Sequence, residues 1–175
     1  MKVFSFDAET DGLWGNAFSI AAIVYDGGKE KAKFLARLPD WFVTDNWVIE
    51  NILPPMANIK VTHDTYESML SDFAKFYLEH SAGATVICHM GFPVEANLLR
   101  EMHRLQFIGD WEGPFPLIDI AANLLHVGEN PTSVDAYVEK FNLPVSDYGT
   151  THNPLYDSEV AAKVFFHLMG RTGSD

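Results

Sequence analysis

The sequence predicts an α/β domain with a mixed β-sheet. Three strands come first, within residues 3–38, and helices then alternate with two more strands. That order is typical of layered α/β domains. A length of 175 residues fits one domain, and 47% hydrophobic residues can build a core without disulfides. We expect a single domain over residues 1–170 and a flexible tail over residues 171–175.

The first three strands are expected to form an antiparallel meander. Residues 3–6 make a short apolar strand that ends at Asp7, and Asp11-Gly12 follows as a turn. Residues 18–25 are rich in β-branched and aromatic side chains, which favours a second strand. Asp26-Gly27-Gly28 then forms a hairpin turn, and residues 33–38 return as the third strand.

The middle of the chain is predicted to hold two helices and a buried strand. A short helix around residues 47–53 ends before Pro54-Pro55. A longer helix covers residues 64–80, where apolar side chains follow the helical period. Asp64 is its expected N-cap, with Glu67 three residues on. Residues 84–88 read as a buried strand.

The last third predicts four helices and one short strand. Pro93 stands at the first turn of a helix that reaches Leu105. A loop over residues 107–116 leads to a strand at residues 117–118. Ser133 is expected to cap the third of these helices. The other two helices are expected at residues 119–126 and 156–169.

The charge and the cysteine content limit the classes of function. There are 24 acidic against 12 basic residues, a net charge of −12, which argues against a tight non-specific grip on long duplexes. It leaves room for a short strand end held by metal ions and local contacts. Cys88 is the only cysteine, so no intrachain disulfide can form, which fits a reducing cytoplasm. No apolar run approaches the ~20 residues of a membrane span, so we expect a cytoplasmic protein without membrane contact.

Two acids near the N-terminus form the first candidate site. Asp7 and Glu9 are two residues apart, which on a strand puts both side chains on one face. Like charges on one face repel, so a cation between them is one explanation for the pair. A solvated strand end with a turn-forming acid is the other.

Two further acids lie in line with buried helix faces. Asp157 precedes Val160 by three residues, so it points toward the apolar stripe of the last helix. Glu95 stands in the same relation to Leu98. Metal ligation would explain both acids, while an N-cap for Asp157 and a favourable helix-terminal charge for Glu95 are the structural alternatives. His152, five residues before Asp157, could accept a proton from water.

These motifs, taken in order, resemble the DEDDh 3′–5′ exonucleases, which have a ribonuclease-H-like fold. FDAETDGL resembles their first motif, and HNPLYDSEVAAKVF resembles their third motif, a His five residues before an Asp. LIDIAANLL and SVDAYVEKFNLP resemble the stretch between the second and third motifs. The second motif departs from the pattern, because HMGFPVEANLL has one extra residue and places Glu95 where the family usually has Asp. Asp119 is a rival for that role, although it fits better as a supporting acid.

The resemblance implies an exonuclease domain with two Mg²⁺ or Mn²⁺ ions. The implied metal ligands are Asp7, Glu9, Glu95 and Asp157, with His152 as the catalytic base. The implied partner is the 3′ end of a single-stranded RNA or DNA, cut to nucleoside 5′-monophosphates. A homodimer is a further expectation from the family. Four residues are expected to contact the terminal nucleotides: Thr10, Leu13, Trp14 and Phe92.

Other functions remain open at this level. The irregular second motif would fit a catalytically silent ribonuclease-H-like module that binds nucleic acid or another protein. A ribonuclease-H-type endonuclease is less favoured, because His152 precedes Asp157 by five residues. An acidic protein that mimics nucleic acid would need no metal. Trp14 and Phe92 could also belong to the core, and Arg100 with Arg104 could form a solvated helix face.

Overall fold

The central sheet of the computed structural model, which describes residues 1–172, has five strands in the order β3-β2-β1-β4-β5. The first three strands pair antiparallel, and β4 and β5 add to β1 in parallel. The predicted meander and mixed sheet are thereby confirmed. The strands are β1 (Lys2–Thr10), β2 (Ala17–Asp26), β3 (Lys29–Arg37), β4 (Thr85–Cys88) and β5 (Leu117–Asp119).

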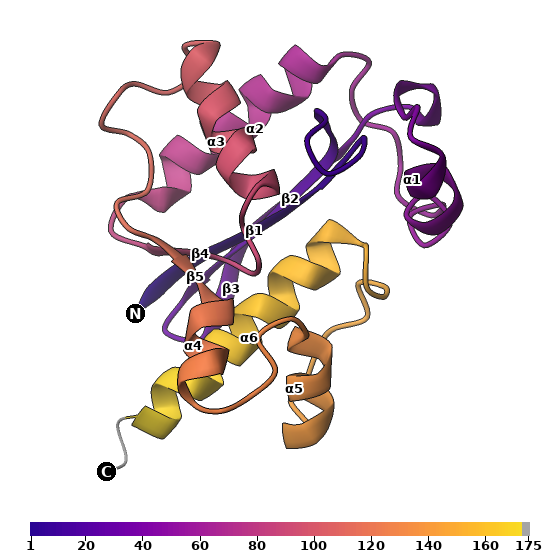
Figure 1. Ribbon diagram of the computed structural model, residues 1–175. Coiled ribbons are helices and arrows are strands. Elements are labelled where there is room, and N and C mark those ends of the chain that lie inside the picture. Colours follow the sequence, from indigo (N-terminus) through magenta and orange to yellow (C-terminus); the bar gives the residue numbers. More distant parts are fainter. Residues whose placement is uncertain (173–175) are drawn as a thin grey trace.

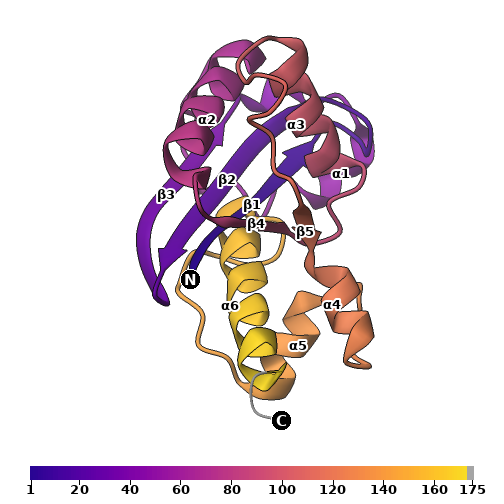
Figure 2. The same cartoon turned by 90° about the vertical axis from the view of Figure 1, so that its left-hand side faces the viewer.

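Helices cover both faces of the sheet and make a three-layered molecule (Figure 1). One face carries α2 (Tyr66–Ser81) and α3 (Val94–Arg104). The other carries α4 (Ile120–His126), α5 (Val134–Phe141) and α6 (Pro154–Thr172), as Figure 2 shows from the side. A 3₁₀ turn, η1 (Asp40–Phe42), and the short helix α1 (Asn46–Asn51) lie between β3 and α2. Two apolar clusters, one on each side of the sheet, form the core.

Strand β1 is longer than the sequence predicts, and this extension carries the two acids. It continues past Asp7 to Thr10 because β2 pairs with it along the whole length. Phe4 and Phe6 pack on the α2 side, whereas Val3 packs on the α6 side. Because side chains alternate along a strand, Asp7 and Glu9 share the α6 face with Val3.

Helix α6 crosses this face and has the buried stripe that its spacing predicts. Val160, Val164 and Leu168 are buried against the sheet. The helix begins at Pro154 and ends at Thr172, so it is longer at both ends than expected. The predicted tail at residues 171–175 therefore starts within the helix, and residues 173–175 lie outside the described residues.

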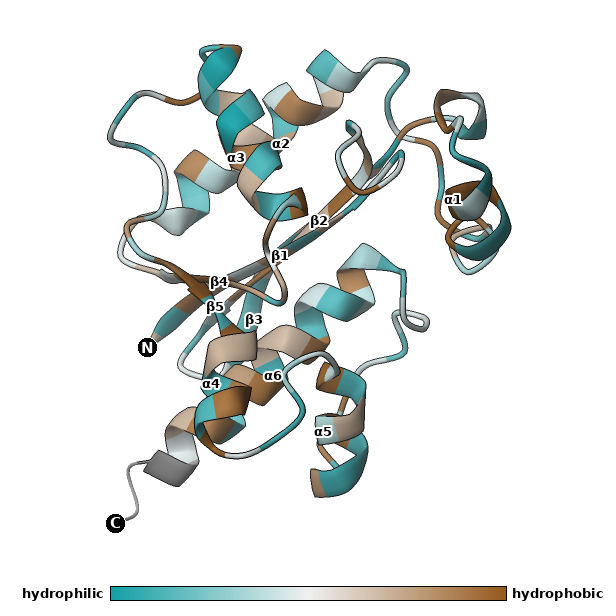
Figure 3. Ribbon diagram, viewed as in Figure 1, coloured by the Kyte–Doolittle hydropathy of each residue, from teal (hydrophilic) through white to brown (hydrophobic). Residues whose placement is uncertain are grey.

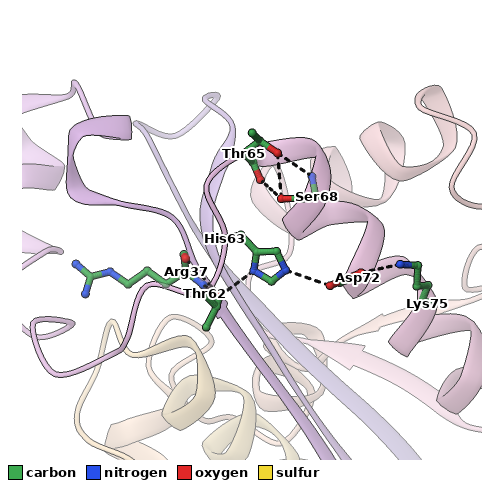
Figure 4. Close-up of polar contacts among 7 residues, drawn as sticks. All are labelled: Arg37, Thr62, His63, Thr65, Ser68, Asp72 and Lys75. Atoms are coloured by element: carbon green, nitrogen blue, oxygen red, sulfur yellow. Dashed lines mark hydrogen bonds and ion pairs between the residues drawn. The ribbon is translucent and has the colours of Figure 1, made fainter.

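The start of α2 differs from the prediction. Thr65, not Asp64, is its N-cap, and the Thr65 Oγ1 accepts a hydrogen bond of 3.2 Å from the Ser68 backbone N–H (Figure 4). The preceding residues are tied to the sheet and to the helix. Thr62 Oγ1 accepts from the Arg37 N–H on β3, and the His63 ring bridges Thr62 and Asp72. These contacts hold residues 62–63 in place, and the helix begins one residue later than the predicted N-cap, Asp64, suggests.

Helix α1 confirms the short helix predicted before Pro54, although it ends earlier, at Asn51. Val48 and Ile52 pack into the core, whereas Trp47 and Ile49 are exposed. Asp45 caps the helix through the Val48 N–H. Among residues 1–172, no helix combines the length and the apolar character needed to cross a bilayer.

Candidate metal centre

Three carboxylates from β1 and α6 meet at the end of the sheet. Asp7, Glu9 and Asp157 each place one ligand atom so that all three atoms lie within 4.8 Å of one another. The first two come from alternate positions of one strand, and the third comes from the first turn of α6, which crosses that strand. Asp157 thus points inward, as its position before the buried stripe predicts.

Glu95 reaches the same place from the opposite layer. It stands in the first turn of α3 and is only 3% exposed. Pairing of β1 with β4 extends along β1 only from Val3 to Ser5, so the backbone beyond is open on that side. Glu95 Oε1 accepts a 3.2 Å hydrogen bond from the Ala8 N–H in this open stretch. Glu95 lines the cavity with the three-acid cluster but is not one of its three members.

The imidazole of His152 stands over the acids. Its Nδ1 lies 3.3 Å from Glu9 Oε1, and its backbone N–H donates to Asp157 Oδ2 over 2.8 Å. The backbone of His152 is left-handed, with φ of 70°, a conformation uncommon for residues other than glycine. The hydrogen bond to Asp157 helps to hold this turn, so the helix that supplies one acid also positions the imidazole.

A cavity of about 340 Å³ joins all five predicted catalytic and metal-binding residues. Asp135, in the first turn of α5, lines the same cavity, and it is not among the site residues predicted from the sequence. Its carboxylate accepts hydrogen bonds from the Thr151 hydroxyl at 2.8 Å and the Tyr156 hydroxyl at 3.0 Å. The sequence does contain a pattern that indicates an inward-facing Asp135, because this residue precedes the buried Val138 by three residues. That spacing is the one that singled out Glu95 and Asp157.

Burial, together with the crowding of the acids, raises their pKa values. Burial raises the pKa of Glu95 to about 8, and burial together with repulsion from Glu9 and Asp135 raises the pKa of Asp157 to about 8. Burial and the charges of the three neighbouring acids raise the pKa of Asp7 well above its ordinary value. Burial also raises the pKa of Glu9, against the opposing hydrogen bond from His152. The hydrogen bond with Glu9 raises the pKa of the His152 ring.

Two contacts hold the turn after β4, whose Met90 lines the cavity. Asp119 accepts hydrogen bonds from the Met90 and Gly91 N–H groups, each 3.0 Å, and from the Ala121 N–H at 2.9 Å. It therefore holds the turn after β4, and the expectation of a supporting acid fits this position. Gly91 packs so closely on Cys88 that a Cβ atom there would lie 2.3 Å from the sulfur. This contact leaves room for glycine alone.

The four predicted nucleotide-contacting residues lie around the cavity rather than within it. Trp14 and Phe92 are 66% and 75% exposed, and their rings meet edge to face at 5.6 Å between centroids. The core placement considered for them is therefore wrong. Thr10 and Trp14 line a second cavity beside the first. Leu13 is exposed on the turn after β1.

The donor set fits divalent metal ions. Three partly buried carboxylates with converging oxygens repel one another unless protons or cations lie between them. Carboxylate oxygens are the ligands that Mg²⁺ and Mn²⁺ favour. A centre built from Asp7, Glu9 and Asp157, with Glu95 beside it, is therefore chemically sound.

Comparison with known proteins shows the fold. No protein-family model matches the sequence, and no curated protein matches it. A solved structure described as Exonuclease X in complex with 5′ overhanging duplex DNA is similar over 99% of this chain and 94% of that one, with a TM-score of 0.59 and 19% identity. The mixed sheet and its helices thus form a ribonuclease-H-like fold, as the resemblance of the motifs implied.

Proposed function

We propose that this protein is a metal-dependent 3′–5′ exonuclease that hydrolyses phosphodiester bonds at the 3′ end of single-stranded RNA or DNA. The observation that carries the proposal is the convergence of Asp7, Glu9 and Asp157 beside His152. The similarity to the exonuclease structure supports it through the fold. Four carboxylates and one imidazole in one cavity are suited to hydrolysis of a phosphodiester with a water nucleophile.

The proposed roles follow from the positions of the side chains. Asp7, Glu9 and Asp157 would hold the divalent ions, and Glu95 would serve them directly or through water. Bound ions neutralise the charge that builds up on the phosphate. Because His152 Nδ1 faces Glu9, this nitrogen carries the proton and Nε2 is left to accept one from the attacking water. The oxygen of the attacking water would bond to phosphorus as the P–O3′ bond breaks. The leaving O3′ would take up a proton from solvent to become the new 3′-hydroxyl of the strand, and a nucleoside 5′-monophosphate would be released.

One assay tests the proposal directly. Single-stranded RNA and DNA oligonucleotides, labelled at the 5′ end to follow shortening or uniformly to detect mononucleotides, are incubated with Mg²⁺, Mn²⁺ or chelator, and the products are separated by length. We expect a ladder that shortens from the 3′ end, mononucleotide products and no reaction in chelator. Circular strands of the same sequence should remain intact, and their cleavage would point to an endonuclease instead.

A catalytically silent module is the second candidate, and Glu95 is the observation that favours it. Its Oε1 is already engaged by the Ala8 N–H, and the longer side chain replaces the usual Asp of the second motif. Such a module would bind metal ions or oligonucleotides without turnover. Calorimetry with Mn²⁺, combined with the ladder assay, separates the two functions.

Replacement of His152 should lower turnover by about 10²-fold, because a general base typically contributes 10²–10⁴-fold. Both His152→Ala and His152→Asn are expected to lose this factor. Asn tolerates a left-handed backbone, so His152→Asn should also keep the stability of the wild type. Turnover and thermal midpoints are compared with His126→Asn, a change at an exposed histidine on α4. Full turnover in either His152 variant would remove the imidazole from the mechanism.

Asp135 should act by positioning the segment that carries His152. Asp135→Ala frees the Thr151 and Tyr156 hydroxyls, each flanking a residue of the site. We expect turnover to fall by about tenfold, which corresponds to ~1.4 kcal/mol, with the loss in kcat rather than in KM. Glu139→Ala, one turn further along α5 and exposed, is the matched control. Equal kinetics for the two variants would show that Asp135 does not position the site.

A further inference from the structure

A second cavity adjoins the candidate metal centre. It has a volume of about 250 Å³ and lies between the turn after β1 and helix α3. Val94 lines both cavities, and Thr10 follows Glu9 directly, so the two spaces meet at the start of α3. Arg100 and Arg104 line the far side of the second cavity. A third hollow of about 880 Å³ continues from there and is lined by the same two arginines.

The sign of the charge changes along this path. Among residues 1–172, no Lys or Arg side chain lines the cavity of the metal centre, which is acidic. The two further hollows instead share two guanidinium groups on one face of α3, four residues and therefore ~6 Å apart along the helix axis. Figure 3 shows that much of α3 consists of hydrophilic residues. In a chain with a net charge of −12, this is a local exception.

The two arginines are not equivalent. Arg104 donates three hydrogen bonds to Glu101, two from Nε at 3.1 and 3.0 Å and one from Nη2 at 2.8 Å. Arg100 is exposed, and within the described part of the chain no hydrogen bond or ion pair engages its guanidinium. A guanidinium that lines an open hollow and donates no hydrogen bond within residues 1–172 is well suited to a phosphate group. Glu101 forms its ion pair with Arg104, both arginines lower the pKa of its carboxyl, and it lines both hollows.

We propose that Arg100, with Arg104 behind it, binds the phosphates of the strand segment that leads into the metal centre. The substrate would then be a polynucleotide long enough to run from the cleft past Trp14 and along α3, rather than a dinucleotide or free nucleotide. This inference rests on the proposed nuclease function. It also explains how an acidic protein attracts a polyanion, because the required positive charge is concentrated at Arg100 and Arg104 along α3.

The test compares substrates of two lengths. Hydrolysis of a dinucleotide and of a single strand of about 12 nucleotides is measured for wild type, Arg100→Gln and Arg104→Gln. The ratio of kcat/KM for the long strand to that for the dinucleotide should fall about tenfold in Arg100→Gln and less in Arg104→Gln. Lys31→Gln, a change at an exposed lysine on β3, should leave both rates and the ratio unchanged.

Binding provides a readout that does not depend on turnover. Fluorescence anisotropy of the labelled 12-nucleotide strand in chelator should show weaker binding for Arg100→Gln and a salt dependence reduced by about 0.7 in its logarithmic slope. Glu101→Gln releases Arg104 and should tighten binding by about two- to threefold, a change in the opposite direction.

The outcomes separate the two proposals. If wild type hydrolyses both substrates but Arg100→Gln keeps the wild-type ratio, salt slope and affinity, the proposed phosphate binding by Arg100 is wrong and the nuclease function stands. If wild type hydrolyses neither substrate but binds the strand through Arg100, the proposed phosphate binding stands and the exonuclease proposal fails. Unchanged affinity in both Arg100→Gln and Glu101→Gln would by itself disprove the proposed phosphate binding along α3.

Discussion

Asp7→Asn is expected to reduce metal-dependent release of mononucleotides by at least about 10³-fold and to make the metal-free protein more stable. Asp7 belongs to the three-acid cluster, and its pKa is raised by burial and by repulsion from Asp157, Glu95 and Glu9. Asn keeps the shape but removes the charge that a cation needs. It also removes the repulsion, so the thermal midpoint in chelator should rise by about 2–4 °C for ~1 kcal/mol.

The opposite signs of the two effects make this variant informative. A mutation that merely damages the fold lowers activity and stability together, whereas loss of a charged ligand lowers activity alone. Asp26→Asn, at the exposed end of β2, is the matched control and should change neither quantity. The stabilisation by added Mg²⁺ should also shrink in Asp7→Asn, measured by thermal scans with and without the ion. Wild-type turnover in Asp7→Asn would refute the proposed centre.

Much of this arrangement could be predicted because it depends on local periodicity. The spacing of Asp7 and Glu9 determines a shared face once the segment is a strand, and β2 makes it one. The offset of Asp157 from Val160 determines that it points inward once α6 is packed. These features need only the period of the element and the burial of its apolar side, and both can be read from the sequence.

Other features could not be predicted because they arise from contacts between distant segments. Arg37 is buried, and its guanidinium donates hydrogen bonds to the backbone carbonyls of Met56 and Ile59. No sequence pattern near Arg37 indicates these contacts. From the sequence, Trp14 and Phe92 could either contact nucleotides or belong to the core, and no local pattern shows that they pair with each other on the surface. Their positions depend on how the turn after β1 meets the turn after β4, which are 78 residues apart in sequence, counted from 14 to 92.

The metal-free protein should lose stability as the pH rises, in contrast to the usual behaviour of carboxylates in ion pairs. Burial raises the pKa of Glu95 and that of Asp157 to about 8, and it raises the pKa of Asp7 as well. In the unfolded chain these groups titrate near pH 4. Between pH 4 and 8 the folded state therefore binds more protons than the unfolded state, and the free energy of unfolding falls as the pH rises. The raised pKa of His152 acts in the same direction.

The expected size of this effect is large enough to measure by thermal scans. From pH 6 to pH 9 in chelator, we expect Glu95 and Asp157 together to account for a loss of about 5 kcal/mol, or roughly 10–20 °C in the thermal midpoint. Glu95→Gln and Asp157→Asn should each flatten the dependence, because each removes one group whose pKa is raised. The exposed-site variant Asp26→Asn should follow the wild-type curve.

Saturating Mg²⁺ should reverse this trend. Divalent ions bind the ionised carboxylates and compete with protons for them, so stabilisation by Mg²⁺ should be small at pH 6 and large at pH 9. At about 10³ times the dissociation constant the gain is about 4 kcal/mol, which is comparable with the loss caused by ionisation. An equal Mg²⁺-induced shift of the thermal midpoint at both pH values would mean that the ion binds elsewhere. The crowded acids would then be a source of strain without a compensating ligand, and a silent fold would explain them better than a nuclease.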